Sequence, residues 1–440
     1  MNTETELLSP PELREAWQVL SQDERVEGFR LLPPGTPDDF FLSLSAHEQG
    51  DLLKSLPPAE RRTWLRLLPP DDAADVIQAV EPELRGELLS HLDDHTRGEV
   101  QALLAYAEDD AGGLMSPRFA RVRPEMSIDE ALRYLRKQAR TRLETFSYVY
   151  VLDAQQRLLG VVSIRELFQA PPDKQVREVM NSEDLVTVPE HMDQEAVSRL
   201  FSESDLIALP VVDEEGRMKG IVTVDDIVDV VQEEATEDIQ KAGGMEALEA
   251  PYFETSLLGL VRKRAGWLAL LFFGGLLTTN AMSHFQDEID KAVVLALFAP
   301  LIISSGGNSG SQASTLIIRA MTLGEVRLRD WWRVMRRELA SGLLLGAILM
   351  GLGFARVGLG EAFFGAYGEA WMPVAFTIAW SLLGVVLWGT LSGSMLPFLL
   401  VRLKLDPASA SAPAVATLVD VVGLLIYFSV ASFALRGTLL

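Results

Sequence analysis

PLIISSGGNSGSQAST, from Pro300 to Thr315, is the segment that tells most about the structure of this chain. It lies in an uncharged run between Lys291 and Arg319 that is long enough to cross a bilayer, yet it is rich in glycine and serine. A second apolar segment, PAVATLVDVVG from Pro413 to Gly423, contains one acid, Asp420. Helix-breaking residues are tolerated at membrane depth where the freed backbone faces protein or a water-filled cavity. We therefore expect both segments to interrupt their helices and to face an ion path; close helix packing through small residues is the alternative.

Five apolar runs bounded by charged residues or histidine are long enough to span a membrane, with Asp420 the one acid inside any of them. They lie between Arg264 and His284, Lys291 and Arg319, Glu338 and Arg356, Glu369 and Arg402, and Asp406 and Arg436. Globular helices seldom run this far without charge, so buried helices of a soluble domain are the weaker interpretation. Basic residues gather in the connections on one side, which by the positive-inside rule predicts a cytoplasmic N-terminal part and an outward C-terminus. These residues are Arg262, Lys263, Arg264, Arg319, Arg327, Arg329, Arg333, Arg336, Arg337, Arg402 and Lys404.

Charge divides the chain of 440 residues, whose net charge is −23, into two parts. Residues 1–260 hold 52 acids and 25 bases, a net of −27, whereas residues 261–440 hold 10 acids and 14 bases, a net of +4. The acidic part argues against nucleic acid as a partner. The start, MNTETELLSP, predicts no secretory signal, so we expect the acidic part to stay in the cytoplasm. Without cysteine, metal ligands are restricted to carboxylate, carbonyl and histidine groups.

Asp420 is the first candidate for a cation ligand. A carboxylate near the middle of a span costs at least about 2.5 kcal/mol on insertion scales, so such residues usually face a pore, a counter-ion or a proton path. No base lies at matching depth in the other runs. Asn308 and the carbonyls around Ser304 and Ala416 supply the neutral oxygen donors that hard cations prefer. These four residues predict a site for a small divalent ion.

At these positions the sequence resembles the MgtE family of magnesium channels. The resemblance is carried by GGNSGSQ from Gly306 to Gln312, LDPASASAP from Leu405 to Pro413, and ATLVDVVGLLIY from Ala416 to Tyr427. It implies a homodimer of five-span subunits around one pore, with the magnesium site on the second and fifth spans. It would place the acidic pore ligand at Asp420, the amide at Asn308 and a carbonyl donor at Ala416, with Ser304 where family members carry glycine.

An internal repeat of about 60 residues occupies the middle of the chain, from Leu114 to Val231. Each copy reads as helix, strand, turn, strand and helix, and the pattern resembles a tandem pair of CBS domains, at 113–172 and 173–232. Such modules often bind adenosyl nucleotides, which implies ATP or a related nucleotide near Thr223 and Asp226. The alternative is that these two residues cap the following helix. Matching positions are Met115, Pro124, Asp153 and Gly160 with Met180, Pro189, Asp213 and Gly220.

Residues 1–112 read as short helices separated by proline pairs, a pattern typical of a helical solenoid. This part resembles the amino-terminal domain of the same family, and YAEDDAGGLMS from Tyr106 to Ser116 resembles its junction with the first CBS copy. The chain lacks a GxxxxGK loop, so ATP-driven pumping has no support in the sequence.

Acidic residues crowd the connector DDIVDVVQEEATEDIQKAGGMEALEAPYFE, from Asp225 to Glu254, which we expect to form a connecting helix over 233–260 that leads into the first span. Like charges at helical spacing repel one another unless cations bind. The functional interpretation is a Mg²⁺ sensor that closes the pore, and the family resemblance implies that this helix acts as a plug; a solvated acidic helix is the alternative. The regulatory ligands implied are Asp226, Asp229, Glu234, Glu237 and Asp238, with Glu195 and Asp205 in the second CBS copy and Asp71 or Asp72 in the first domain.

The sequence therefore predicts a multidomain α+β membrane protein: a helical solenoid-like domain, tandem CBS domains, an acidic connecting helix and a five-helix transmembrane domain over 261–440. We expect a Mg²⁺-selective channel of the inner membrane, gated by intracellular Mg²⁺, homodimeric, in contact with lipid, and not an enzyme. A proton- or sodium-coupled transporter that uses Asp420 is the first alternative. A nucleotide sensor with a membrane anchor is the second.

Overall fold

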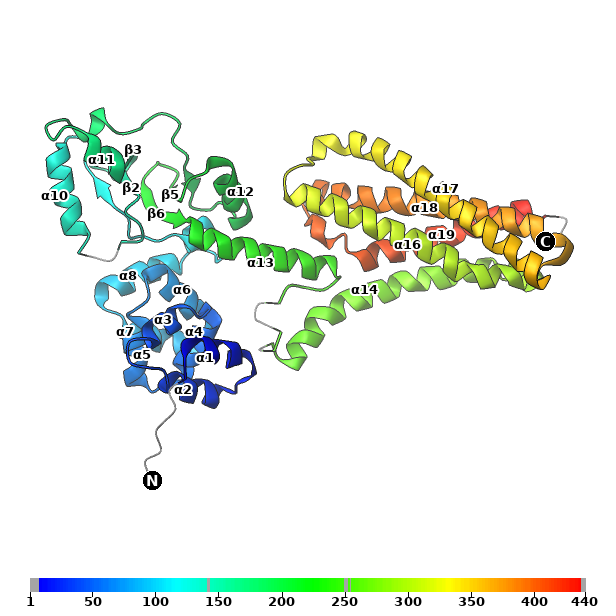
Figure 1. Cartoon of the computed structure of the whole chain (residues 1–440), viewed down its shortest axis with the longest axis horizontal. Helices are drawn as coiled ribbons and strands as arrows, with labels where there is room; N and C mark the ends of the chain where they lie inside the picture. The colour runs from blue at the N-terminus through cyan, green and yellow to red at the C-terminus, as the bar shows by residue number, and fades with distance from the viewer. Residues whose placement is uncertain (1–7, 141–142, 249–251, 254, 437–440) are drawn as a thin grey trace, which may run out of the picture. The chain divides into compact units, whose positions relative to one another are not determined.

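The computed structural model describes residues 8–140, 143–248, 252–253 and 255–436. The chain divides into two compact units, Met1–Glu234 and Ala235–Leu440. The first holds short helices and two small sheets, and the second holds the long apolar helices (Figure 1). The predicted fold class is confirmed.

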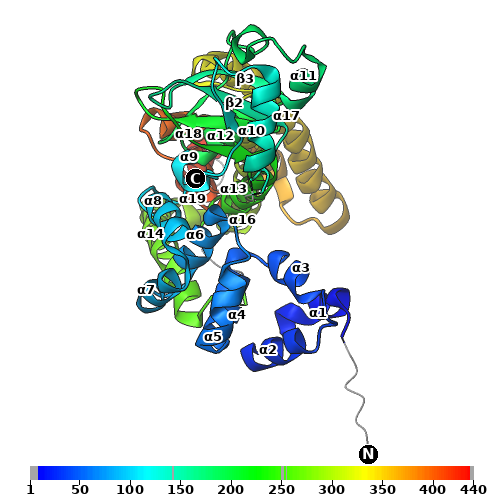
Figure 2. The same ribbon diagram turned by 90° about the vertical axis from the view of Figure 1, so that its left-hand side faces the viewer.

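The first unit begins with a stack of short helices, which Figure 2 shows from the side. Their starts follow the prolines: Pro58, Pro70 and Pro82 each occupy the first turn of a helix, where a missing N–H costs nothing. Helices α2, α4, α6 and α8 pack in succession, while α5 packs on α7, as a solenoid requires. The helices are α1 Pro10–Ala16, α2 Gln22–Arg30, α3 Pro37–Leu42, α4 Ala46–Ser55, α5 Pro58–Leu65, α6 Pro70–Ala79, α7 Pro82–His91, α8 Asp94–Leu103 and α9 Ala111–Leu114.

The repeat folds into two sheets of the same topology. In each, the first strand is parallel to the second, which pairs antiparallel with the third. The first copy contains β1 Arg121–Val122, α10 Ile128–Gln138, β2 Tyr148–Leu152, β3 Leu158–Ser163 and α11 Ile164–Gln169. The second contains β4 Val188–Pro189, α12 Gln194–Ser204, β5 Ala208–Val212, β6 Met218–Thr223 and α13 Val224–Ala242.

The matching glycines and methionines of the repeat meet across the two copies. A Cβ atom on Gly220 would lie 2.8 Å from Met115 Cγ, and one on Gly160 would lie 2.9 Å from Met180 Sδ. Each copy therefore places its methionine on the glycine of the other, and a larger residue at either glycine would displace that side chain.

The connecting helix is shorter than the sequence predicted. Helix α13 ends at Ala242 instead of continuing to residue 260. The cause is local: Gly244 adopts a φ of +77°, a left-handed conformation that stops a helix and that glycine adopts without strain. The next helix begins only at Leu257.

The second unit contains five helices long and apolar enough to cross a membrane, among the residues that the structure describes. Helix α18 packs against α16, α17 and α19, and α14 packs against α19. The helices are α14 Leu257–His284, α16 Val293–Thr322, α17 Trp331–Phe364, α18 Trp371–Arg402 and α19 Ala412–Ala434, with the short α15 Gln286–Lys291 between the first two and the 3₁₀ turns η3 Leu328–Asp330 and η5 Pro407–Ser409 in the connections.

The predicted interruption of the second span is wrong. Helix α16 runs without a break through Pro300 and the glycines. These glycines serve close packing: a Cβ on Gly389 of α18 would lie 2.2 Å from the Gly306 carbonyl oxygen, and one on Gly393 would lie 2.0 Å from that of Gly310. Small residues spaced four apart on both helices let the backbones approach, which was the alternative interpretation. Helix α19 is continuous as well, from Ala412 to Ala434.

Candidate ion pathway and acidic cluster

Helices α16 and α19 run antiparallel past each other at the predicted pore site. A Cβ on Gly310 would lie 2.8 Å from Val415 Cγ1, one on Gly307 would lie 3.7 Å from the Ala416 Cβ, and one on Gly306 would lie 2.9 Å from Val419 Cγ1. From Gly310 toward Ser304 along α16, the facing residues of α19 run from Val415 toward Asp420. The structure therefore brings the two segments that carry the predicted pore residues together at one level of the bundle.

A polar stripe follows the outer surface of α16. Ser304, Asn308, Gln312 and Thr315 are all exposed. Their spacing of four, four and three residues keeps them on one face of the helix, and the glycines occupy the opposite side. Gln312 and Thr315 were not predicted as pathway residues, although their spacing from Asn308 is readable in the sequence. Such a stripe provides hydroxyl and amide oxygens along more than three turns of the helix.

Asp420 and Ala416, both on α19, are half-buried. Within the described ranges, neither a hydrogen bond nor an ion pair joins the Asp420 carboxylate to another residue. The main-chain carbonyls of Ser304 and Ala416 lie inside continuous helices, so each already accepts a helical hydrogen bond and has one lone pair left. Among the described residues, no group of three or more histidine, aspartate or glutamate side chains is arranged to hold a metal ion as the side chains stand, so an ion at the pore or in an acidic region would need further oxygen donors or a rearrangement of these side chains.

A second group of carboxylates lies between α6 and the start of α13. We call it the acidic cluster, and its members interact electrostatically in the folded first unit. It comprises Asp71, Asp72 and Asp75 of α6, Glu144 before β2, and Asp225, Asp226 and Asp229 of α13.

Burial and like charge both act on these carboxyls. Desolvation and then neighbouring carboxylates raise the pKa of Asp75 to about 8, and desolvation together with Asp225 and Glu144 raises that of Asp226 to about 7 against the hydrogen bonds from Thr223. The pKa of Asp71 is also raised, by burial first and then by Glu144, and its Oδ1 atom is buried without a hydrogen-bond partner among the described residues. Asp72 is more exposed and keeps more of its water. Buried carboxyls in this setting hold protons or bind cations.

The predicted regulatory residues separate into those inside the cluster and those outside it. Asp72, Asp226 and Asp229 are brought together, whereas Glu234 accepts a hydrogen bond of 2.7 Å from Gln194 Nε2. Glu195 lies 3.4 Å from Arg199, and Asp205 ends α12 in a left-handed conformation.

Asp75, Glu144 and Asp225 are members of the cluster that were not predicted from the sequence. Asp75 could have been found from its helical spacing with Asp71 and Asp72, which places all three near one face of α6. Glu144 carried no such signal, since only the fold brings its loop to the cluster.

The last turn of α13 belongs to the second unit and contacts it through charged groups. Lys241 Nζ lies 2.6 Å from Asp406 Oδ2, next to η5, and also pairs with Glu237 one turn earlier. Thr322 at the end of α16 donates a hydrogen bond of 3.2 Å to Asp238 Oδ2. Burial alone would lower the pKa of Lys241, but the hydrogen bonds to Asp406 and Glu237 outweigh it and raise that pKa. Two predicted regulatory acids, Glu237 and Asp238, therefore have neutralising or polar partners here.

The candidate nucleotide residues adopt the capping arrangement. Thr223 donates from its backbone N–H and its hydroxyl to Asp226 Oδ2, at 3.3 and 2.6 Å. Ser163 and Glu166 repeat this geometry in the first copy, at 2.8 Å for both contacts. The capping alternative thus describes the geometry, and a ribose at this place would have to share the Asp226 carboxylate.

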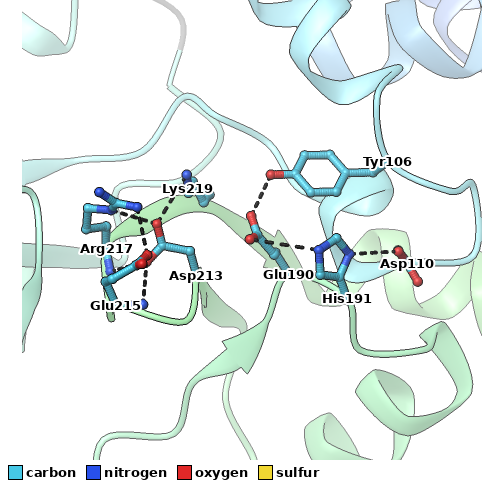
Figure 3. A network of polar contacts seen from close by, with 8 residues as sticks. All are labelled: Tyr106, Asp110, Glu190, His191, Asp213, Glu215, Arg217 and Lys219. Carbon is cyan, nitrogen blue, oxygen red and sulfur yellow. Dashed lines mark hydrogen bonds and ion pairs between the residues drawn. The ribbon is translucent and has the colours of Figure 1, made fainter.

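A network of side chains joins the helical domain to the second CBS copy (Figure 3). Tyr106 donates a hydrogen bond of 2.6 Å to Glu190, and His191 Nδ1 lies 3.2 Å from Asp110 Oδ2. Nearby, desolvation would raise the pKa of Asp213, but hydrogen bonds from Arg217 and Lys219 prevail and lower it to about 2. These contacts fix the junction between α8 and β4 and so hold α6 in reach of α13.

Family models match most of the chain. Residues 299–430 match a divalent cation transporter model, residues 8–109 match the MgtE intracellular N domain, and residues 111–173 and 176–233 match the CBS domain.

Two similar proteins are bacterial transporters. The chain is 44% identical over 338 residues to the magnesium transporter MgtE of Thermus thermophilus, covering 77% of this chain and 73% of that protein. It is 35% identical over 338 residues to that of Bacillus subtilis, covering 76% and 71%. A crystal structure of the cytosolic domain of the Mg²⁺ channel MgtE in complex with ATP matches 51% of this chain and 92% of its own, at 44% identity and a TM-score of 0.47.

Proposed function

The chain belongs to the MgtE family of magnesium transporters, and on that premise we propose that it is a Mg²⁺-selective channel of the cytoplasmic membrane that closes when intracellular Mg²⁺ binds its acidic domains. The family is one of transporters, and its members are multi-pass membrane proteins. The observation that carries the proposal is the half-buried Asp420 of α19, a helix that packs on α16, whose outer face bears the exposed polar stripe.

We infer conduction from the exposed polar stripe of α16. An exposed row of amide and hydroxyl groups facing lipid would leave polar groups without water. A second copy of the chain would cover the row and enclose a wet path between two stripes. This path would hold two Asp420 carboxylates, enough charge to attract a divalent ion that keeps most of its hydration shell. We therefore infer a homodimer with Asp420, Asn308, Ser304 and Ala416 at the ion site.

Gating is assigned to the acidic cluster and to α13. Without Mg²⁺, the carboxyls of the cluster repel one another or must hold protons; with Mg²⁺, α6 and α13 are held together. Helix α13 continues from the cluster to Lys241 without a break, so its position responds to the bound ion. Asp72, Asp226 and Asp229 are the central ligands of the proposed sensor, with Glu234, Glu237, Asp238, Glu195 and Asp205 as outer members.

Two further assignments complete the proposal. The positive-inside pattern supports a cytoplasmic N-terminal part and an outward C-terminus. The CBS pair supports binding of ATP or another adenosyl nucleotide close to Thr223 and Asp226. Equilibrium dialysis with ATP should then show weaker binding to Thr223→Val than to the unchanged protein.

The decisive experiment measures Mg²⁺ entry into liposomes that contain the purified full-length protein and an internal dye, with no proton or sodium gradient. The unchanged protein and Asp287→Ala, an exposed acid outside the pathway, should conduct; Asp420→Ala should not. Flux that requires an imposed gradient would favour the coupled transporter, and no flux from the unchanged protein would favour a membrane-anchored sensor. Equal flux through Asp420→Ala would refute the assigned ion site.

The sensor is tested by the triple variant Asp72→Asn, Asp226→Asn, Asp229→Asn in the same liposomes. The variant should keep conducting at a Mg²⁺ concentration that closes the unchanged protein, because its cluster no longer needs the ion. Asp173→Asn, which changes an exposed acid in the loop after α11, is the control and should close normally. Closure of the triple variant at the normal concentration would contradict the sensor.

A further inference from the structure

An arginine-rich segment precedes and opens α17. Within eleven residues it contains Arg327, Arg329, Arg333, Arg336 and Arg337, which we call the arginine cluster, and all five are exposed. Among the residues that the structure describes, none of these guanidinium groups forms an ion pair. The pore, the sensor and the CBS pair make no use of them.

The acids nearby offset this cluster only in part: three lie close to it, Glu325, Asp330 and Glu338, of which Glu338 interacts with Arg337, against five arginines. Asp330, the one acid inside the segment, accepts a hydrogen bond of 3.1 Å from the Arg327 backbone N–H and caps the turn before the helix. Glu338 is half-buried on the side of α17 that holds the buried Val334, away from the outward face. The cluster therefore presents an excess of positive charge to its surroundings.

The outward face of α17 changes from charge to hydrocarbon along its length. Trp331 and Trp332 are 49% and 53% exposed beside the arginines, and Leu344, about three turns further on, is 69% exposed. Arg336 and Leu343 are seven residues apart, about 10 Å along the axis, and share the outward face. Arginines and the two indole rings share the first two turns of the helix and leucines follow, as the phosphate and interface region of a phospholipid precedes its acyl chains.

We propose that the arginine cluster with Trp331 and Trp332 binds the phosphate headgroup of an anionic phospholipid, whose acyl chains lie on the exposed leucines of α17. This inference rests on the membrane insertion stated above. Guanidinium groups form paired hydrogen bonds to phosphate oxygens, and basic side chains next to a bilayer favour anionic over neutral lipid. An acidic protein segment would satisfy the charge but would leave the adjoining leucine surface uncovered, so a lipid is the occupant that fits both.

The test measures lipid retention rather than transport. Full-length protein is reconstituted with phosphatidylcholine and a minor fraction of phosphatidylglycerol, extracted in detergent, and its bound lipids are counted by native mass spectrometry. The unchanged protein should retain phosphatidylglycerol over phosphatidylcholine. The triple variant Arg333→Gln, Arg336→Gln, Arg337→Gln should bind it at least about tenfold more weakly, since each basic residue near a membrane surface contributes about fivefold.

A matched control removes the same charge outside the membrane spans, on and just after α10. Arg136→Gln, Lys137→Gln, Arg140→Gln alters three exposed basic residues and should change retention less than about threefold. If both triple variants lose lipid equally, net charge is responsible and the site is refuted. Equal retention of phosphatidylcholine by the unchanged protein would refute it as well.

Two further arms complete the experiment. Arg333→Lys, Arg336→Lys, Arg337→Lys keeps the charge and loses the guanidinium fork, so its intermediate retention would support the site even if the glutamine variant fails to insert. Displacement of phosphatidylglycerol by inorganic phosphate at equal concentration would show a plain anion site and would overturn a lipid as the occupant. Because retention is counted without measuring flux, failure of the proposed channel function would leave this result readable.

Discussion

Asp75 offers the sharpest test of the acidic cluster. Desolvation and the carboxylates of Asp72, Glu108 and Asp226 raise the pKa of Asp75 from 3.8 to about 8. At pH 7 the folded protein thus holds this carboxyl about nine-tenths protonated, whereas the unfolded chain ionises it. The folded pKa is the higher one, so the stability this group provides is present below pH 4 and is lost as pH rises toward 8. In this range each pH unit lowers the free energy of unfolding by about 1.4 kcal/mol, which amounts to about 4 kcal/mol between pH 4 and pH 7.

Mg²⁺ bound at the neighbouring Asp72 and Asp226 should displace this proton, because a nearby cation favours the ionised form of a carboxyl group. Mg²⁺ added to weakly buffered full-length protein at pH 7 should release protons, of which about 0.9 per chain comes from Asp75. Asp75→Asn, an isosteric change with no proton to lose, should release that much less. A pH indicator dye follows the release during a Mg²⁺ titration.

Two comparisons make the proton count decisive. At pH 9.5 Asp75 is already ionised, so the difference in proton release between the unchanged protein and Asp75→Asn should vanish. Asp173→Asn, at an exposed acid outside the cluster, should behave as the unchanged protein does. If Asp75→Asn released as many protons at pH 7 as the unchanged protein, our account of this carboxyl would be refuted.

Two other predictions concern the second unit. Amide hydrogen exchange in the last turn of α13 should become about fivefold faster in Lys241→Gln and in Asp406→Asn, because an ion pair this close and partly buried contributes about 1 kcal/mol. The double variant should exchange no faster than either single variant. Additive effects would show that the pair does not interact. Gly389→Ala should lower the temperature at which detergent-solubilised protein loses its monodisperse peak, because its Cβ would meet the Gly306 carbonyl oxygen at 2.2 Å. Gly351→Ala, which meets no atom within 4 Å, should leave that temperature unchanged, and equal effects would refute the steric argument.

The spans and the repeat were predictable because both depend on patterns local in the chain. Charge bounds each apolar run, and a helix in lipid satisfies its own backbone, so composition alone identified all five spans. The repeat was recognisable because two copies of one sheet need the same glycine and methionine, at Gly160 and Met180 or Gly220 and Met115.

The predictions from the sequence were wrong or incomplete where contacts between distant parts of the chain determine the structure. Glycine and serine in the second span looked like an interruption, yet α16 is continuous because α18 supplies a partner surface of Gly389 and Gly393. The length of α13 was overestimated because acidic residues continue past Gly244 while the helix does not. Glu144 joined the cluster through folding alone, since about seventy residues separate it from α6 and about eighty from Asp225.

The single helix α13 also has a mechanical consequence. Nineteen residues make a rod of about 28 Å, with carboxylates of the cluster at one end and Lys241 at the other. A rod does not absorb rotation as a loop does: a tilt of about 10° about its first turn moves its far end by about 5 Å. If ions bind at the first turn as proposed, their contacts there would become a displacement at the far end comparable to the width of a hydrated cation's path. Lengthening or shortening the helix by one turn would then change that displacement without changing the residues at either end.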